Sequence, residues 1–138
     1  MTEVLVRPAA RDELPRLARL ADAAMGDDVV SAGSAHRMPP GDRVFVAECE
    51  GRSAGFAAVH EQDDALVLDQ LVVAATDRAR HVGHTLLDWV EGFGVSLSLT
   101  RVRVPLVGAD DRARAFYLRR GYAEADGALE RELPHMDG

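Results

Sequence analysis

Four basic side chains gather in a short stretch of the chain between an apolar segment and a glycine. Within the seven positions 78–84 lie Arg78, Arg80, His81 and His84, with Gly83 among them. This is a high local density of basic groups for a protein whose net charge is −7. The apolar segment before them predicts a strand, and the segment from Gly83 onward predicts a helix. A helix N-terminus presents unpaired N–H groups and the positive end of its dipole, and a small residue there permits close approach. We therefore expect this loop to bind a phosphate-bearing ligand.

A second set of side chains could move protons. The groups able to give or take a proton are the phenol of Tyr117, the carboxylate of Asp69, and His60 and Glu61 at the end of the preceding predicted strand. Each also has a purely structural interpretation. Tyr117 could be a core residue of an amphipathic helix, and Asp69 and His60 could be solvated strand residues.

Other site chemistries fit the sequence less well. The three-residue spacing of His81 and His84 could hold a metal, but no third ligand lies nearby in the sequence, so we predict no metal site. The glycine-rich fingerprint of dinucleotide-binding folds is absent, and a P-loop requires a lysine that this chain lacks. We interpret Cys49 as a packing residue in a strand.

The predicted elements that must position these groups are strands interleaved with helices. Strands are expected at 4–7, 44–49, 54–60, 66–73, 99–104 and 129–133; helices are expected from Asp12, over 83–93 with its end at Gly92 and Gly94, and from Asp110 or Asp111 to Arg120. The segment 26–40 has no clear pattern. Three consecutive strands before the loop and its helix favour an α+β layered sheet over a doubly wound one. At 138 residues, we expect one domain over 1–138.

Composition narrows the setting. The acidic balance argues against a nucleic-acid surface, and no apolar run approaches the 18 residues of a membrane span. One cysteine cannot form an internal disulfide, and the first residues do not resemble a leader peptide. We expect a cytoplasmic protein.

Two motifs resemble those of the GNAT superfamily of N-acetyltransferases. The acetyl-CoA loop of that family runs from Arg or Gln, through two residues, Gly and one residue, to Gly or Ala. Here Arg78 and Gly83 agree with its ends, while His81 stands where the middle glycine is expected. The second motif, an Asn, an Ala, Phe-Tyr and Gly-Phe at fixed spacing, is matched by Asp110, Ala113, Phe116, Tyr117, Gly121 and Tyr122.

The resemblance implies a fold and a set of site residues. The fold is a central mixed, mostly antiparallel sheet flanked by helices, in which the fourth and fifth strands splay apart near Pro105. Acetyl-CoA is the implied cosubstrate, with the main chain of Leu71, Val72 and Val73 along its pantetheine arm. The other implied cofactor-binding residues are Arg78, Ala79, Arg80, His81, Val82, Gly83, His84, Thr85, Asp110, Ala113 and Phe116. The resemblance implies that Tyr117 is the general acid; as the base we favour Asp69, with His60 second.

The expected function is transfer of an acetyl group to a primary amine by direct attack. Because His81 replaces a glycine in the loop, a catalytically silent acyl-CoA-binding or regulatory domain is the alternative, and a cofactor-free interaction protein is a further one. The acceptor site would be formed by 26–40 and the region after Gly121. A homodimer through edge strands stays open.

Overall fold

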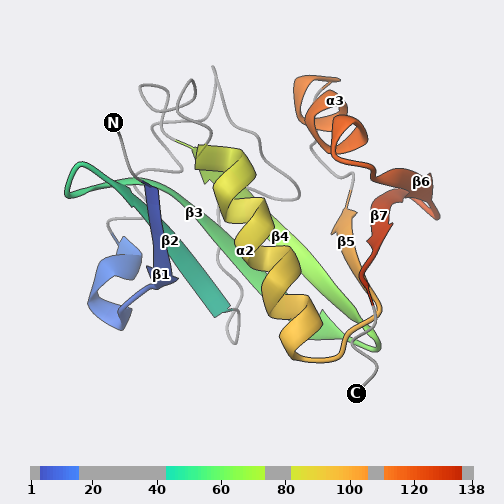
Figure 1. Ribbon diagram of the computed structural model, residues 1–138, viewed down its shortest axis with the longest axis horizontal. Coiled ribbons are helices and arrows are strands. Elements are labelled where there is room, and N and C mark those ends of the chain that lie inside the picture. The colour runs from blue at the N-terminus through green and yellow to red at the C-terminus, as the bar shows by residue number, and fades with distance from the viewer. Residues whose placement is uncertain (1–3, 16–42, 74–81, 106–110, 135–138) are drawn as a thin grey trace.

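One mixed sheet of seven strands, in the order β1-β2-β3-β4-β5-β7-β6, forms the centre of the molecule (Figure 1). The computed structural model describes residues 4–15, 43–73, 82–105 and 111–134. The strands are β1 (Val4–Pro8), β2 (Arg43–Cys49), β3 (Arg52–Gln62), β4 (Ala65–Val73), β5 (Arg101–Pro105), β6 (Ala123–Ala125) and β7 (Ala128–Glu132); the helices are α2 (Val82–Ser96), α3 (Asp111–Arg119) and the 3-10 turn η1 (Arg11–Glu13). The predicted α+β fold class is confirmed.

Several element boundaries differ from the predictions. Helix α2 continues through Gly92 and Gly94 to Ser96, so the prediction that these glycines end it was wrong. Asp12 does not cap a helix; it lies inside η1, where the Glu13 carboxylate accepts the N–H of Ala10 at 2.8 Å. The short strand β6 was not predicted. The rest of the first predicted helix and the segment 26–40 lie outside the described residues.

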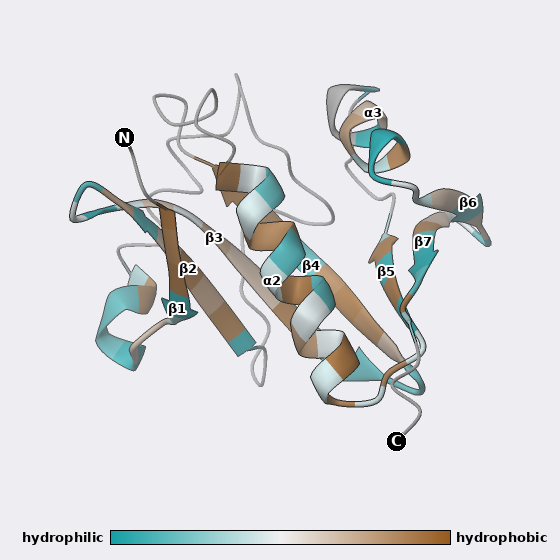
Figure 2. Cartoon of the chain, in the orientation of Figure 1, coloured by the Kyte–Doolittle hydropathy of each residue, from teal (hydrophilic) through white to brown (hydrophobic). Residues whose placement is uncertain are grey.

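Helix α2 covers one face of the sheet and builds the main core (Figure 2). Its buried Val82, Leu86, Leu87 and Val90 pack with alternate residues of β2, β3 and β4 in one cluster. A smaller cluster of Val46, Phe56 and Val72 lies apart from it, with Leu14 packed against it. Because strand residues alternate between faces, this second cluster marks the face opposite α2.

An irregularity in β4 allows both ends of this strand to face α2. Leu68 pairs with Val59 and Gln70 pairs with Ala58, so Asp69 is an extra residue in the ladder, a β-bulge. Leu66 and Leu68 before the bulge, and Leu71 and Val73 after it, all belong to the α2-facing core. Strict alternation would have turned the second pair away from α2. The bulge therefore keeps four large apolar side chains buried on one face.

The sheet divides between β4 and β5. These strands run parallel and pair only at Ala65–Arg101, Leu66–Val102 and Val67–Arg103. Beyond Val67, β4 keeps its antiparallel partner β3 as far as Val73, whereas β5 continues beside β7 to Pro105. Figure 1 shows the two strands meeting at one end and diverging toward the other. The splay near Pro105 that the resemblance implied is thus present.

Within the described segments, no helix is long and apolar enough to cross a membrane.

Close contact between β3 and β4 explains one glycine of β3. A Cβ atom at Gly55 would lie 2.5 Å from the carbonyl oxygen of Val72, so the backbone of one strand would have to move. We expect Gly55→Ala to lower the free energy of unfolding by about 1–3 kcal/mol, as overpacking usually does. Gly92→Ala is the matched control: nothing lies within 4 Å of its Cβ position, so alanine should stabilise α2 by about 0.5–1 kcal/mol. Urea titration of both variants tests this, and equal midpoints would contradict it.

Candidate active site

The opening between β4 and β5 exposes backbone groups in the middle of the sheet. On one side of β4, Leu71 pairs with Ala57, Val72 with Phe56 and Val73 with Gly55. On the other side, the ladder with β5 has already ended at Val67, so no described strand pairs there. This strand edge can therefore accept another extended partner. It contains Leu71, Val72 and Val73, the residues predicted to hold a cofactor through their main chain.

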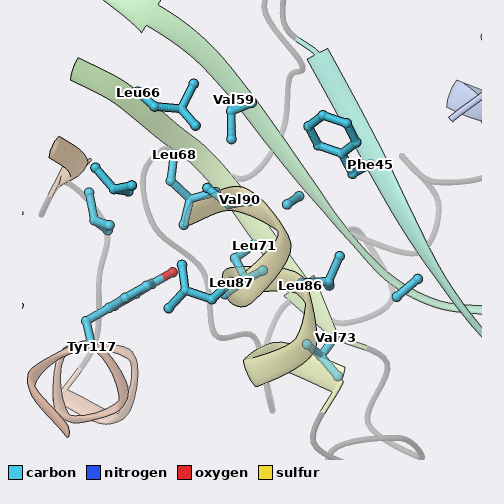
Figure 3. Packing of buried hydrophobic residues seen from close by; sticks show 14 of the residues in the cluster. Phe45, Val59, Leu66, Leu68, Leu71, Val73, Leu86, Leu87, Val90 and Tyr117 are labelled. Carbon is cyan, nitrogen blue, oxygen red and sulfur yellow. The ribbon is translucent and has the colours of Figure 1, made fainter. Parts of the chain in front are cut away.

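Tyr117 points from α3 into the core beside this opening. Its side chain is fully buried, and its ring packs edge-on against Phe116 and Tyr122 at centroid distances of 5.2 and 5.5 Å. Figure 3 shows the hydroxyl oxygen directed toward Leu87 of α2. That oxygen has no hydrogen-bond partner among the described residues. Burial raises the pKa of the Tyr117 phenol well above its usual value, so the group keeps its proton at neutral pH.

An unpartnered hydroxyl is costly in an apolar core. Burying such a group without a hydrogen bond costs about 1–3 kcal/mol in proteins. Phenylalanine would fill the same space without that cost. The hydroxyl of Tyr117 therefore suits a donor for a polar atom that comes into the opening, which is the role expected of a general acid.

The N-terminus of α2 lies close to the end of β4. A Cβ atom built on Gly83 would be 3.5 Å from the Phe116 ring and 3.6 Å from a methyl group of Val73, which is ordinary contact. The His84 ring packs against Phe116 at 4.9 Å between centroids. The structure thus brings Val73, Gly83, His84 and Phe116 together, with Val82 buried beside them and Thr85 in the next position of α2.

His60 and Asp69 form a close pair on the opposite face of the sheet. Nδ1 of His60 lies 2.5 Å from Oδ2 of Asp69. Val59 and Leu68, their neighbours in sequence, belong to the α2-facing core, so the paired side chains face the other way. Glu61, the third candidate base, pairs in register with the core residue Leu66 and so lies on the face away from His60.

A polar cluster attaches α3 to α2. Glu91 of α2 accepts hydrogen bonds from Arg120 at 3.1 Å, from the Tyr122 hydroxyl at 2.8 Å and from Arg131 at 3.2 Å. Arg120 also contacts Asp88 at 2.6 Å. The arginine follows Tyr117 by three residues, so the cluster fixes the end of the helix that carries the phenol. The sequence did not predict this cluster, because its members lie far apart along the chain.

Five predicted cofactor residues cannot be placed. Arg78, Ala79, Arg80, His81 and Asp110 lie outside the described residues, and Ala113 is placed only as a member of α3. In the portion of the chain that the structure describes, no group of three His, Cys, Asp or Glu side chains could hold a metal ion.

The fold and the site now define a class of protein. Residues 40–124 match a family model described as an acetyltransferase (GNAT) domain. The chain is therefore an enzyme of the acyltransferase class. More narrowly, since the match covers more than half of the sequence, the chain belongs to the GNAT acetyltransferase family, whose members use acetyl-CoA.

Solved structures share this fold at low sequence identity. A GNAT-family acetyltransferase from Staphylococcus aureus superposes with a TM-score of 0.77 at 14% identity, covering 96% of this chain and 100% of the other. The ribosomal-protein-S18-alanine N-acetyltransferase of Escherichia coli gives 0.73 at 18% identity, over 99% and 97%. A phosphinothricin acetyltransferase from Sinorhizobium meliloti, solved in complex with acetyl-CoA, gives 0.74 at 15% identity, over 94% and 88%. No curated protein matches the sequence.

The two buried tyrosines should respond oppositely to loss of their hydroxyl groups. Tyr122→Phe removes a hydrogen bond to the Glu91 carboxylate and should lower the free energy of unfolding by about 2 kcal/mol. Tyr117→Phe removes an unpartnered hydroxyl and should leave stability unchanged or raise it by up to about 1 kcal/mol. Denaturant unfolding of the two variants measures this difference. A larger loss for Tyr117→Phe would mean that its hydroxyl has a partner in the free protein.

The same tyrosines should govern stability in alkali, since the chain contains two tyrosines and no lysine. Burial raises the pKa of both phenols, so above about pH 10 the unfolded chain releases protons that the native protein retains. The free energy of unfolding should therefore fall above pH 10, by up to about 1.4 kcal/mol per pH unit for each tyrosine. Tyr117→Phe should halve that slope in unfolding experiments between pH 10 and 11.5. An unchanged slope would contradict the burial of the phenol.

Proposed function

We propose that this enzyme transfers the acetyl group of acetyl-CoA to a primary amine of a small molecule or peptide by direct attack. Two observations in the described residues carry the proposal together: no strand pairs with β4 on its β5 side beyond Val67, and the buried hydroxyl of Tyr117 has no hydrogen-bond partner. Membership of the GNAT family supports the choice of acetyl-CoA. The amine acceptor is proposed only as a chemical class.

The edge of β4 suits a cofactor that carries amide groups. N–H and C=O groups of Leu71, Val72 and Val73 would pair with such an arm as a strand pairs with its neighbour. A backbone N–H at Val73 or beside it would polarise the thioester carbonyl, because a fixed donor stabilises the oxyanion that forms during attack. The α2 N-terminus and the loop before it, with Arg78, Arg80 and His81, would hold the pyrophosphate.

Tyr117 would supply the acid. When bound, acetyl-CoA supplies an acyl group on a thiolate leaving group. The phenol of Tyr117 keeps its proton at neutral pH and has no competing partner among the described residues, so it can give that proton to the departing sulfur. Removal of a proton from the amine would fall to Asp69 and His60, which meet on the other face of the sheet.

The positions of acid and base fit a reaction that occurs within the sheet. Tyr117 belongs to the core on the α2 side, whereas His60 and Asp69 face the opposite side. A thioester held between β4 and β5 could be reached from both faces. The amine would then approach from one face while the sulfur is protonated from the other, so the base and the acid would not compete for the same space.

Thiol release tests the proposed activity. Wild-type protein, Gly83→Trp and Tyr117→Phe should be compared with acetyl-CoA and a panel of amines. The indole at position 83 should collide with Phe116 and Val73 and close the site, since a Cβ alone already contacts both. Tyr117→Phe should lower kcat by about 100-fold or more while leaving stability intact. Equal rates for all three proteins would reject the mechanism.

Ligand binding provides a second measurement and separates the alternatives. Acetyl-CoA at about 100 times its dissociation constant should stabilise the wild type by roughly 2.7 kcal/mol. A silent acyl-CoA-binding domain would show this stabilisation without thiol release. A cofactor-free interaction protein would show neither. Tyr122→Phe, assayed below its melting temperature, should retain activity and is the control for changes in the tyrosine cluster.

A further inference from the structure

The contact between His60 and Asp69 indicates that these two candidate bases have different roles. Resting on the proposed function, we infer that His60 is the group that takes the proton of the acceptor amine, and that Asp69 is a positioning residue that acts through the His60 ring. Three observations support this: the geometry of the pair, its place in the sheet, and the greater exposure of the His60 side chain than of the Asp69 side chain.

The geometry fixes which ring nitrogen of His60 carries the proton in the neutral ring. Oδ2 of an ionised carboxylate can only accept a hydrogen bond, so at 2.5 Å from it Nδ1 of His60 must carry the proton. In the neutral ring, Nε2 then bears the lone pair and is the basic atom. Asp69 thereby selects the tautomer and orients the ring, and it stabilises the imidazolium that forms when Nε2 takes a proton.

The β-bulge creates this contact. Asp69 is the residue of β4 that has no counterpart on β3, and it lies between Leu68 and Leu71, which both face α2. His60 pairs in register with Val67, two residues before Asp69. A bulge re-aims the side chain at its extra residue. In this chain the extra residue is the carboxylate that meets the imidazole.

The pair lies where the sheet opens. Val67, the register partner of His60, is also the last residue of β4 that pairs with β5. Asp69 is already on the part of β4 that has left β5. The proton acceptor thus lies at the vertex of the opening, on the face away from Tyr117.

Exposure favours the imidazole over the carboxylate as the proton acceptor. The side chain of His60 is 36% exposed and that of Asp69 is 19% exposed, so a water or an amine reaches the histidine more readily. The greater exposure of the imidazole assigns the proton transfer to His60.

Other charges face this pair from the neighbouring strands. Arg103 of β5 is in register with Val67, and Glu130 of β7 pairs with Arg103 at 2.5 Å, so both lie on the same face as His60. Their opposite charges compensate each other. The carboxylate of Asp69 is therefore the charge that acts most directly on the ring.

The proton balance is complete with residues of this chain and solvent. Nε2 of His60 takes a proton from the ammonium group, directly or through one water, and the imidazolium later releases it to solvent. The neutral amine nitrogen forms a bond with the acetyl carbon, and the carbon–sulfur bond breaks with its electron pair going to sulfur. Tyr117 gives its proton to that sulfur, and the proton that leaves the acetylated nitrogen returns to the phenol, directly or through solvent. The products are the amide and free CoA.

Kinetics with matched variants test the assignment. We expect His60→Gln to lower kcat by about 100-fold or more, with unchanged stabilisation by acetyl-CoA. Asp69→Asn should lower kcat by about 10-fold or more through the wrong tautomer. His60→Ala should regain acetylated amine, detected by mass, when imidazole is added. Glu132→Gln is the control: it removes a carboxylate on β7 instead of β4 and should change kcat less than twofold.

The contrary outcomes are distinct. Full activity of His60→Gln together with loss in Asp69→Asn would make Asp69 the direct base, and full activity of both would place the base elsewhere. A wild type that releases no CoA with any amine would reject the proposed function and this inference with it.

Nitrogen-15 spectra of histidine in the free protein give a readout independent of activity: the Nδ1-protonated tautomer of His60 should be present in the wild type and lost in Asp69→Asn. An Nε2-protonated ring in the wild type would overturn the assignment.

Discussion

Backbone hydrogen bonding along β4 is the constraint on which the rest of the structure depends. The strand is buried almost throughout, and its side toward β3 is paired from Ala65 to Val73. Its side toward β5 is paired only through Val67 among the described residues. Buried N–H and C=O groups are seldom left without partners, because the cost is comparable to that of a lost hydrogen bond. A ligand that lies along this edge with amide groups of its own meets that need without any rearrangement of the sheet.

Several features of the chain keep the edge available. Pro105 stands at the end of β5, beyond the last pair with β4, and has no N–H with which to continue a ladder. Gly55 allows β3 to approach Val72 so closely that β4 is held firmly from its other side. Glu91 holds Arg120 and Tyr122, so the end of α3 is fixed to α2. The opening is therefore built into the packing on both sides of it.

Much of this arrangement could be predicted from the sequence, and the exceptions have physical reasons. The alternation of apolar residues predicted six of the seven strands that the described residues form, and the spacing of Phe116, Tyr117, Gly121 and Tyr122 located the phenol. The end of α2 was placed too early, because glycine is a weak stop signal when packing favours continuation: Gly94 faces Leu133 so closely that its Cβ would lie 2.6 Å from a methyl group. The bulge at Asp69 follows from register with β3, which no local pattern contains. The sequence named Asp69 and His60 as alternatives, and only the register brings them into one pair.

The short ladder between β4 and β5 also makes the width of the gap sensitive to the angle between the two strands. The strands are joined by three pairs that end at Val67 and Arg103, and Val73 lies six residues farther along β4. At about 3.3 Å per residue this part of β4 is about 20 Å long, so a rotation of about 5° at Val67 moves Val73 by nearly 2 Å. A change of that size is comparable to one methylene group. Substitutions near Arg103 would therefore change the width of the gap at Val73, although the two residues lie far apart along the sheet.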